Sequence, residues 1–346
     1  MVCVMPWTSD FATIEDSQMD DVLIRVKDLK AAFRIDGKMV NVIEDISFDI
    51  KKGEILGIAG ESGSGKSVTS KCIMQLISDP GKITGGQILL DSGEDVLKYN
   101  EKQRRSYRGS KVSMIFQEPM TSLNPVFTCK DQIMEAIQLH QKVSKKEAEA
   151  RTLEMLKLVG IPSPELRMNC YPFELSGGMR QRMMIAMALC CNPELLIADE
   201  PTTALDPTIE AQILDLIRTI QADRKMSVLF ITHDLAVIAE LCHRVIIMYA
   251  GHIMEMAPVE EIFEHPMHPY THGLMKAIPK IDEDLEWLYN IKGRVPSLTE
   301  IPAGCVFNNR CPYATDKCRN ERPSLEERSP GHKVSCWKTL EEGGGF

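Results

Sequence analysis

The residues from Gly60 to Ser67 have the types and spacing of a loop that binds phosphate groups. They read glycine, four residues, then Gly-Lys-Ser. Glycine lets the backbone curl so that successive N–H groups point at phosphate oxygens, and the start of a following helix adds its positive end. The residues expected to contact the phosphates of a nucleoside triphosphate are Gly60, Ser62, Gly63, Ser64, Gly65, Lys66, Ser67 and Val68.

The last two residues of this loop have the most specific chemistry. We expect Lys66 to bridge the β- and γ-phosphates and the Ser67 hydroxyl to bind Mg²⁺. The alternative is a glycine-rich turn with a chance lysine. A predicted strand at Ile55–Ala59 and a predicted helix at Val68–Ile77 flank the loop as the P-loop pattern requires, which favours the phosphate site.

Two carboxylates follow a second apolar run, Leu195–Ala198. Such a run predicts a buried central strand, and open α/β sheets bind ligands at the carboxyl ends of their strands. Asp199 is therefore expected to hold Mg²⁺ through water, and Glu200 to act as the general base on the attacking water. A core strand followed by a solvated acidic turn is the alternative.

A second helix start suited to phosphate lies at Ser176-Gly177-Gly178. The motifs of this chain, taken in order, resemble those of an ABC-transporter ATPase subunit. They are the P-loop, Gln117, this serine-glycine segment, the pair at 199–200, Ala204-Leu205-Asp206 and His233. The resemblance covers residues 22 to about 257.

The resemblance implies how the chain is built and with what it assembles. It implies an α/β fold with a P-loop NTPase (RecA-like) core, an antiparallel β subdomain and an α-helical subdomain at about 118–175 that docks on a membrane permease. A helical linker without special function is the alternative for 118–175. In this family two nucleotide-binding domains pair head to tail, with each ATP between the P-loop of one and the serine-glycine segment of the other.

The resemblance also implies roles for single residues. Ser176, Gly177 and Gly178 would contact the γ-phosphate of ATP bound to the partner domain. Further implied roles are catalysis and Mg²⁺ binding for Gln117, contact with the γ-phosphate for His233, coupling between the two sites for Asp206 and stacking on adenine for Phe33. The alternatives are a structural histidine at a strand end for His233 and an ordinary core phenylalanine for Phe33.

Two stretches are similar to one branch of the family, the peptide importers. They are Ser176–Arg182, which has Met179 where the commonest family form has glutamine, and Gln117–Pro125. This similarity implies an energy-coupling subunit that hydrolyses ATP to drive uptake of di- or oligopeptides through a separate permease.

Composition and length fit three regions: an acidic tail at 1–20, a nucleotide-binding domain at 21–257 and a C-terminal extension at 258–346. Nine of the 19 prolines follow residue 250, which predicts a loop-rich extension. The net charge of −9 gives no support for a nucleic-acid partner. The sequence shows no apolar run long enough to span a membrane, and it does not begin with the basic and then apolar regions of a signal peptide. We therefore expect the protein to associate peripherally with the cytoplasmic face of the membrane.

Four of the 11 cysteines lie close together in the extension, at Cys305, Cys311, Cys318 and Cys336. Four thiolates suit an iron–sulfur cluster or zinc, and unligated thiols are the third possibility. The extension resembles the C-terminal region of oligopeptide and dipeptide importer ATPases, some of which carry a 4Fe–4S cluster. That resemblance favours the cluster, acting as a staple for a segment without a core of its own.

The expected partners are a second ABC ATPase subunit, as a heterodimer by resemblance, two permease subunits and, indirectly, an extracellular solute-binding protein. Uptake of nickel or a metal complex is an alternative, because the ATPase chain does not touch cargo. A soluble ABC ATPase of translation or DNA repair is a further alternative. It is disfavoured because the chain has one P-loop, one serine-glycine segment and no sustained heptads.

Overall fold

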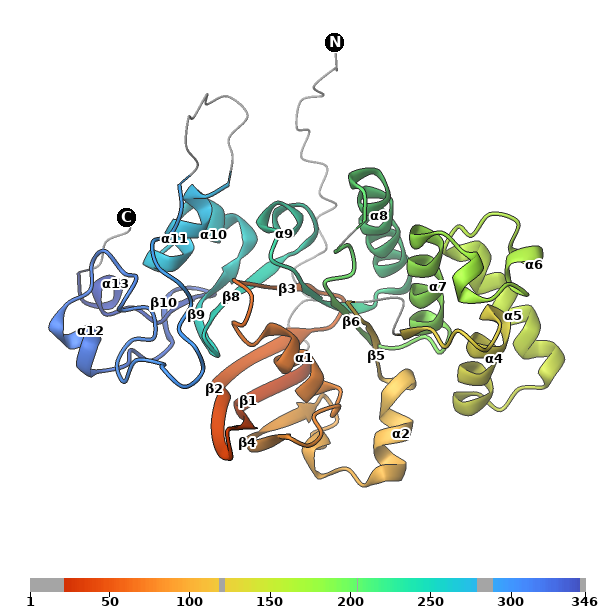
Figure 1. Ribbon diagram of the computed structural model, residues 1–346, viewed down its shortest axis with the longest axis horizontal. Helices are drawn as coiled ribbons and strands as arrows, with labels where there is room; N and C mark the ends of the chain where they lie inside the picture. Colours follow the sequence, from red (N-terminus) through yellow and green to blue (C-terminus); the bar gives the residue numbers. More distant parts are fainter. Residues whose placement is uncertain (1–21, 118–121, 204, 279–288, 343–346) are drawn as a thin grey trace, which may run out of the picture.

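Two β-sheets organise the chain, and the larger one carries the phosphate-binding loop (Figure 1). The computed structural model describes residues 22–117, 122–203, 205–278 and 289–342, so the predicted acidic tail at 1–20 lies outside the described residues. The strands are β1 Val22–Ile35, β2 Lys38–Lys51, β3 Ile55–Ala59, β4 Gly81–Leu90, β5 Val112–Ile115, β6 Leu195–Asp199, β7 Ser227–Ile231, β8 Arg244–Tyr249, β9 His252–Pro258, β10 Glu326–Ser329 and β11 His332–Val334.

The larger sheet has the strand order β10-β11-β9-β8-β3-β7-β6-β5. Strands β8, β3, β7, β6 and β5 run parallel, and every residue of β3, β7 and β6 is buried. Parallel strands covered on both faces read as continuous apolar runs, which is why the sequence predicts β3 at its observed bounds and β6 with the exception of its last residue, Asp199. The P-loop leaves β3, Asp199 ends β6 and Glu200 follows it, so both motifs lie at the same edge of the sheet.

The smaller sheet is antiparallel, with the order β2-β1-β4. It is formed by two strands of 14 residues and one of 10. The sequence predicts a short strand at Ile46–Ile50, and the structure extends it to Lys38–Lys51. The extra length comes from pairing with β1 along nearly all of that strand, from Val22 to Ile35. Strand β1 supplies backbone hydrogen bonds to the residues of β2 before Ile46, whose apolar–polar alternation alone is too weak to indicate a strand.

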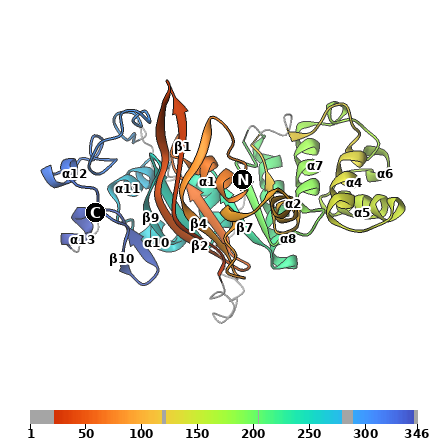
Figure 2. The same cartoon turned by 90° about the horizontal axis from the view of Figure 1, so that it is seen from below.

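The helices lie beside the larger sheet and at both ends of the molecule, with α4 to α6 at one end and α12 and α13 at the other (Figures 1 and 2). They are α1 Lys66–Ile73, α2 Glu101–Ser110, α4 Cys129–His140, α5 Lys145–Leu158, α6 Pro164–Arg167, α7 Gly177–Leu189, α8 Pro207–Arg224, α9 Leu235–Leu241, α10 Val259–Glu264, α11 Pro269–Lys276, α12 Asp316–Asn320 and α13 Trp337–Glu342. Short 3-10 helices are at Val96–Lys98 and Pro172–Glu174. Helix α1 ends four residues before the predicted Ile77.

A helical group, α4 to α6, projects from the sheet at the end opposite the C-terminal extension (Figure 2). Thr128 and Ser144 cap α4 and α5 with side-chain hydrogen bonds to the helix backbone. The group packs on α7 through buried Ile137, Leu156 and Met184. It falls within the predicted helical subdomain at 118–175, of which residues 118–121 lie outside the described residues.

The C-terminal extension is joined to the larger sheet. Strands β10 and β11 form an antiparallel hairpin, and β11 pairs with β9. Tyr270 and Phe307 of the extension share one buried cluster with Val245 and Tyr249 of β8. The extension shares the core of the sheet rather than forming one of its own, because β9 offers it a strand edge and β8 an apolar face. Among the described residues, no helix is long and apolar enough to cross a membrane.

Candidate functional site

The P-loop runs from the end of β3 into α1 and depends on its glycines. Gly60 has φ +148°, and a Cβ there would overlap the carbonyl oxygen of Met248. Gly65 has φ +99° and caps α1, with the carbonyl oxygen of Val42 3.3 Å from where its Cβ would be. A side chain at either position would strain the backbone and displace a neighbouring strand. The loop therefore has the curled form that a phosphate cradle needs.

Lys66 lies inside this curl and is 5% exposed. Its Nζ donates to the carbonyl oxygens of Gly60 at 2.7 Å and Glu61 at 3.1 Å. Burial lowers the pKa of Lys66, and the carboxylates of Glu200, Asp199 and Glu61 oppose that shift. A buried ammonium beside loop carbonyls is suited to a phosphate group, which would satisfy its charge more fully.

Two further features fit a bound nucleotide with Mg²⁺. The Ser67 hydroxyl donates to Asp199 Oδ1 at 2.9 Å, so two hard oxygen donors of the kind Mg²⁺ prefers stand side by side. Burial raises the pKa of Asp199, and the Ser67 hydrogen bond opposes that shift. The buried hydroxyl oxygen of Ser64 has no hydrogen-bond partner, which leaves a polar atom of the loop unsatisfied. Ser67 and Asp199 could hold Mg²⁺, and the unpaired Ser64 hydroxyl could donate to a phosphate oxygen.

Glu200 lies between two other residues predicted for the site, Gln117 and His233. Its carboxylate accepts from Gln117 Nε2 at 3.0 Å and from Thr203 Oγ1 at 3.0 Å, and His233 Nδ1 lies 3.5 Å away. Gln117 follows β5, Glu200 follows β6 and His233 follows β7, so three adjacent parallel strands bring them together. Thr203 was not predicted; its only sequence signal is its place three residues after Glu200.

The backbone at Glu200 is in a sparsely populated conformation. Its φ is +48°, although it is not glycine, and its N–H donates to the carbonyl oxygen of Ile231 at 2.9 Å. Strained backbone of this kind persists only where the surroundings enforce it, and it is concentrated at functional sites. Here the strain turns the carboxylate toward the ends of the neighbouring strands.

The predicted serine-glycine segment forms the N-terminus of α7. The Ser176 side chain caps the helix by accepting from the Met179 N–H at 3.3 Å. Ser176 and Gly177 are exposed, and a Cβ at Gly177 would meet no atom within 4 Å. Gly178 faces Ile209 of α8. The end of the segment therefore packs on the neighbouring helix α8, whereas Ser176 and Gly177 are open to solvent.

Asp206 and Phe33 have local contacts that explain their residue types. Asp206 is exposed and caps α8 by accepting from the Ile209 N–H at 3.0 Å. Phe33 is half-buried on β1, and its ring fills the space above Gly81 on β4, where any Cβ would collide with it. Both residues have structural roles in the described chain. The coupling role of Asp206 and adenine stacking by Phe33 stay predictions.

The four predicted metal-ligating cysteines converge on one region of the extension. Cys305 and Cys336 are buried, and Cys311 and Cys318 are half-buried. Burial raises the pKa of Cys305 to about 11 and that of Cys311 to about 12, and Cys318 and Cys336 add to both shifts. Across the described part of the chain, no three or more His, Cys, Asp or Glu side chains are arranged to hold a metal ion.

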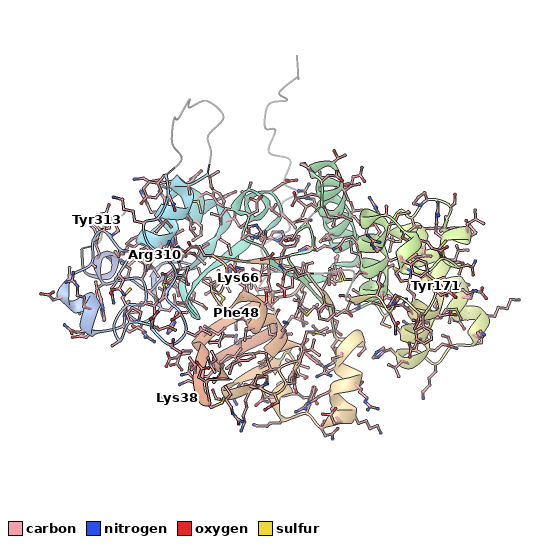
Figure 3. The ribbon with its side chains drawn as sticks, viewed as in Figure 1. Lys38, Phe48, Lys66, Tyr171, Arg310 and Tyr313 are labelled. Carbon is pink, nitrogen blue, oxygen red and sulfur yellow. The ribbon has the colours of Figure 1, made fainter. Side chains whose placement is uncertain are left out.

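The structure also places two residues against the P-loop that the sequence did not indicate. Arg310 and Tyr270, both from the extension, contact Glu61. In Figure 3, Lys66 lies near the centre of the molecule, with Arg310 on the side of the extension and Tyr171 on the opposite side. A separation of 249 residues in sequence gives no local signal for the Arg310–Glu61 pair.

Two family models match the chain. The model described as "ABC transporter" matches residues 43–203, and that described as "Oligopeptide/dipeptide transporter, C-terminal region" matches residues 254–318. A dipeptide transport ATP-binding protein of Escherichia coli K12 is 47% identical over 93% of this chain and 98% of its own length. A probable peptide ABC transporter ATP-binding protein of Sinorhizobium fredii is 50% identical over 93% of this chain and 96% of its own.

Solved structures give the same result for the fold. The dimeric structure of a bacterial ABC transporter cassette superposes with a TM-score of 0.62 at 28% identity, covering 68% of this chain and 99% of that one. A post-hydrolysis structure of the same cassette, bound to ADP and Pi, superposes equally well, with 27% identity over 68% of this chain and 99% of that one. The α/β fold predicted from the sequence is confirmed.

Proposed function

The chain belongs to the family of ABC transporter ATP-binding proteins, and from this premise we propose that it hydrolyses ATP to drive peptide uptake through a separate membrane permease. The observation that carries the proposal is the geometry around Glu200. A carboxylate held by Gln117 and Thr203, with His233 nearby, lies one residue from the Ser67–Asp199 pair. This arrangement joins a water-activating base to a phosphate and Mg²⁺ site.

The mechanism follows from the roles of these side chains. The P-loop backbone and Lys66 bind the phosphates, and Ser67 and Asp199 would hold Mg²⁺, which neutralises charge on the phosphate oxygens. Glu200 accepts a proton from the attacking water as the water reaches the γ-phosphate. Gln117 and His233 orient that carboxylate and the water. Each of these roles is a proposal about this chain, supported by the distances between the side chains.

Peptide cargo is supported by the relatives and by the extension. The curated relatives named above carry peptide or dipeptide transport in their descriptions, and each aligns over more than nine-tenths of this chain. The oligopeptide/dipeptide C-terminal region matches 254–318, a segment outside the nucleotide-binding motifs. We propose di- or oligopeptides as the cargo on these grounds.

Exposed surfaces support the proposed partners. The open N-terminus of α7 at Ser176 and Gly177 suits a second ATPase chain, related to this one or identical, whose bound ATP would contact it. On the helical group, Val126, Phe127 and Phe173 are 52% to 71% exposed. Backbone hydrogen bonds from Cys129 to Cys170 and from Lys130 to Met168 hold their two segments side by side, which suits these apolar side chains to docking on a permease. Docking there would place the chain peripherally at the membrane.

We propose that Cys305, Cys311, Cys318 and Cys336 hold a 4Fe–4S cluster, with zinc as the alternative. The Cys305 N–H donates to the carbonyl oxygen of Cys318 at 2.8 Å, so two of the four residues lie side by side in the segment that matches the oligopeptide/dipeptide C-terminal region. The test is to purify the full chain without oxygen, record its visible spectrum and quantify iron, sulfide and zinc. About four irons per chain support the cluster. About one zinc per chain in a colourless protein contradicts the cluster and supports the alternative.

The ATPase proposal is tested by Glu200→Gln. Glutamine keeps an acceptor for Gln117 and Thr203 but cannot take a proton from water. We expect hydrolysis to fall by about 10²- to 10⁴-fold, which is the usual contribution of a general base, while ATP still binds. Phosphate release and equilibrium binding of ATP measure the two effects separately.

Glu194→Gln is the matched control. Glu194 precedes β6, is exposed and pairs with Lys111 at the opposite end of the strand from Glu200. This variant should hydrolyse ATP at the wild-type rate. Near-normal turnover by Glu200→Gln would contradict the general-base assignment.

A further inference from the structure

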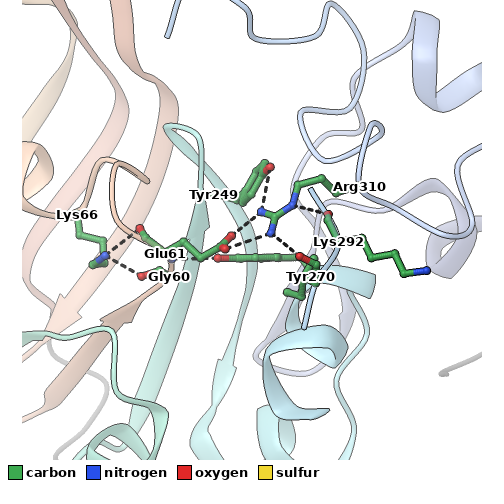
Figure 4. A network of polar contacts seen from close by, with 8 residues as sticks. Gly60, Glu61, Lys66, Tyr249, Tyr270, Lys292 and Arg310 are labelled. Atoms are coloured by element: carbon green, nitrogen blue, oxygen red, sulfur yellow. Dashed lines mark hydrogen bonds and ion pairs between the residues drawn. The ribbon is translucent and has the colours of Figure 1, made fainter. Parts of the chain in front are cut away.

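The C-terminal extension reaches the P-loop directly through one ion pair. Arg310 Nη1 lies 2.6 Å from Glu61 Oε2, and Nη2 lies 3.1 Å from Glu61 Oε1 (Figure 4). The side chain of Arg310 is 5% exposed and that of Glu61 is 33% exposed. A two-point contact between a buried guanidinium and a carboxylate fixes both groups in direction as well as in distance.

The backbone of Glu61 is held from both sides. Its N–H donates to the hydroxyl of Tyr270 in α11 at 3.0 Å, and its carbonyl oxygen accepts from Lys66 Nζ at 3.1 Å. One residue of the P-loop thus connects the extension with the lysine expected to bind the β- and γ-phosphates (Figure 4). A shift of Glu61 would move a hydrogen-bond acceptor of Lys66.

Arg310 is itself fixed before it meets Glu61. Its Nε donates to the carbonyl oxygen of Lys292 at 3.1 Å, and Nη2 donates to that of Ile291 at 3.1 Å. Its guanidinium carbon lies 5.6 Å from the centre of the Tyr249 ring, within the range of cation–π attraction. Glu61 is therefore held by a rigid group rather than by a flexible surface arginine.

The charge of Glu61 is the reason that this contact matters for nucleotide binding. A carboxylate within a loop that binds a triphosphate repels that anion unless a cation neutralises it. Arg310 supplies the cation from a site with little water, where screening is weak. The same contact that holds the loop also removes an electrostatic cost of binding.

We propose that Arg310, supported by Tyr270, is a positioning residue for ATP binding. It holds Glu61 and neutralises its charge, so the C-terminal extension sets the affinity of the P-loop for ATP. This inference rests on the proposed function, because it requires that the P-loop bind ATP.

Two substitutions in the full chain test the inference, because they act in opposite directions. Arg310→Met removes the cation and leaves the carboxylate, so the Kd and KM for ATP should rise about five- to tenfold with little change in kcat. Glu61→Gln keeps an acceptor for the guanidinium but leaves its charge uncancelled, so ATP should bind as tightly as in the wild type or more tightly. Binding is measured with Mg²⁺ present by displacing a fluorescent trinitrophenyl-ATP.

Arg322→Met is the matched control. Arg322 is another arginine of the extension, and it pairs with Glu44 of β2 at 2.9 Å and with His252 of β9 rather than with Glu61. Its loss should leave ATP affinity unchanged. Equal weakening by Arg310→Met and Arg322→Met would overturn the inference, because loosening of the extension alone would then explain the effect.

Three other results bear on the inference. Weakened binding in both Arg310→Met and Glu61→Gln would overturn it in favour of a purely structural pair, and wild-type affinity in Arg310→Met would also overturn it. If Arg310→Met does not fold, the ATP affinity of Glu61→Gln decides. Affinity equal to or higher than that of the wild type supports the inference, and lower affinity overturns it. Failure of the wild-type chain to bind ATP would overturn the proposed function, whereas normal wild-type binding with an unaffected Arg310→Met overturns the inference alone.

Discussion

Glu255→Gln should loosen the C-terminal extension from the larger sheet, because Glu255 connects three segments inside the core. Its side chain is fully buried on β9. Oε1 accepts from the Met267 N–H at 2.6 Å and lies 2.7 Å from His332 Nε2, and Oε2 accepts from the His268 N–H at 3.0 Å. The carboxylate thus satisfies donors before α11 and on β11 at once.

The expected loss of stability follows from counting these donors. The oxygen of glutamine can keep the two contacts of Oε1, but its amide group then faces the His268 N–H and leaves a buried donor unpaired. That alone costs about 1–3 kcal/mol. Because the two contacts of Oε1 stay in place, the expected total is about 1–3 kcal/mol.

Thermal unfolding followed by circular dichroism measures this loss. At about 2–4 °C per kcal/mol for domains of about 150–250 residues, the midpoint should fall by roughly 2–12 °C. Limited proteolysis should cut within 259–342 earlier than in the wild type. Glu261→Gln is the control, because Glu261 is 47% exposed and lies 3.9 Å from the same imidazole, His332 Nδ1. A midpoint for Glu255→Gln equal to that of this control would refute the reasoning.

Two more predictions concern pH and the P-loop. Burial lowers the pKa of His268 to about 4. A histidine held neutral in the fold stabilises it fully above its unfolded pKa of 6.5 and loses that contribution as the pH falls toward 4, so the wild type should lose about 2 kcal/mol more than His268→Asn between pH 6.5 and about 4.5 in urea unfolding. Gly60→Ala should weaken ATP binding by about tenfold or more in a titration, because its Cβ overlaps the Met248 carbonyl oxygen.

Each of these two predictions has a control or a contradicting result. Asparagine at 268 can still cap α11 through the Tyr270 N–H, so it removes the titration and keeps the helix start. Equal pH dependence in both proteins would contradict the assignment to His268. Gly37→Ala also has a positive φ but meets open space, so it should cost about 1 kcal/mol of stability and leave ATP affinity intact. Equal ATP affinity in Gly60→Ala and Gly37→Ala would contradict the packing argument.

Much of the nucleotide site could be predicted from short segments of sequence. The P-loop residues from Gly60 to Ser67 and the pair Asp199-Glu200 stand next to apolar runs that become β3 and β6. In these cases one local pattern fixes both the strand and the loop that leaves it. Parallel pairing then brings the strand ends together, which is why Gln117, Glu200 and His233 meet.

The place of the extension could not be predicted in this way. Prolines and scattered cysteines indicate irregular chain, but they carry no information about which surface that chain covers. The edge of β9 and the apolar face of β8 decide this, because they offer backbone partners and a surface for Tyr270 and Phe307. The bounds of β2 and α1 differ from expectation for a related reason, since neighbouring segments set where pairing and packing stop.

The sequence by itself determined the phosphate chemistry of this protein, because types and spacing within a few residues are enough to shape a P-loop and to place a carboxylate at a strand end. The tertiary structure alone decided what surrounds that chemistry. Arg310 reaches Glu61 across 249 residues, and His332 reaches Glu255 across 77. Contacts of this range arise only after the sheet and the extension have packed together, so no local pattern of residues encodes them.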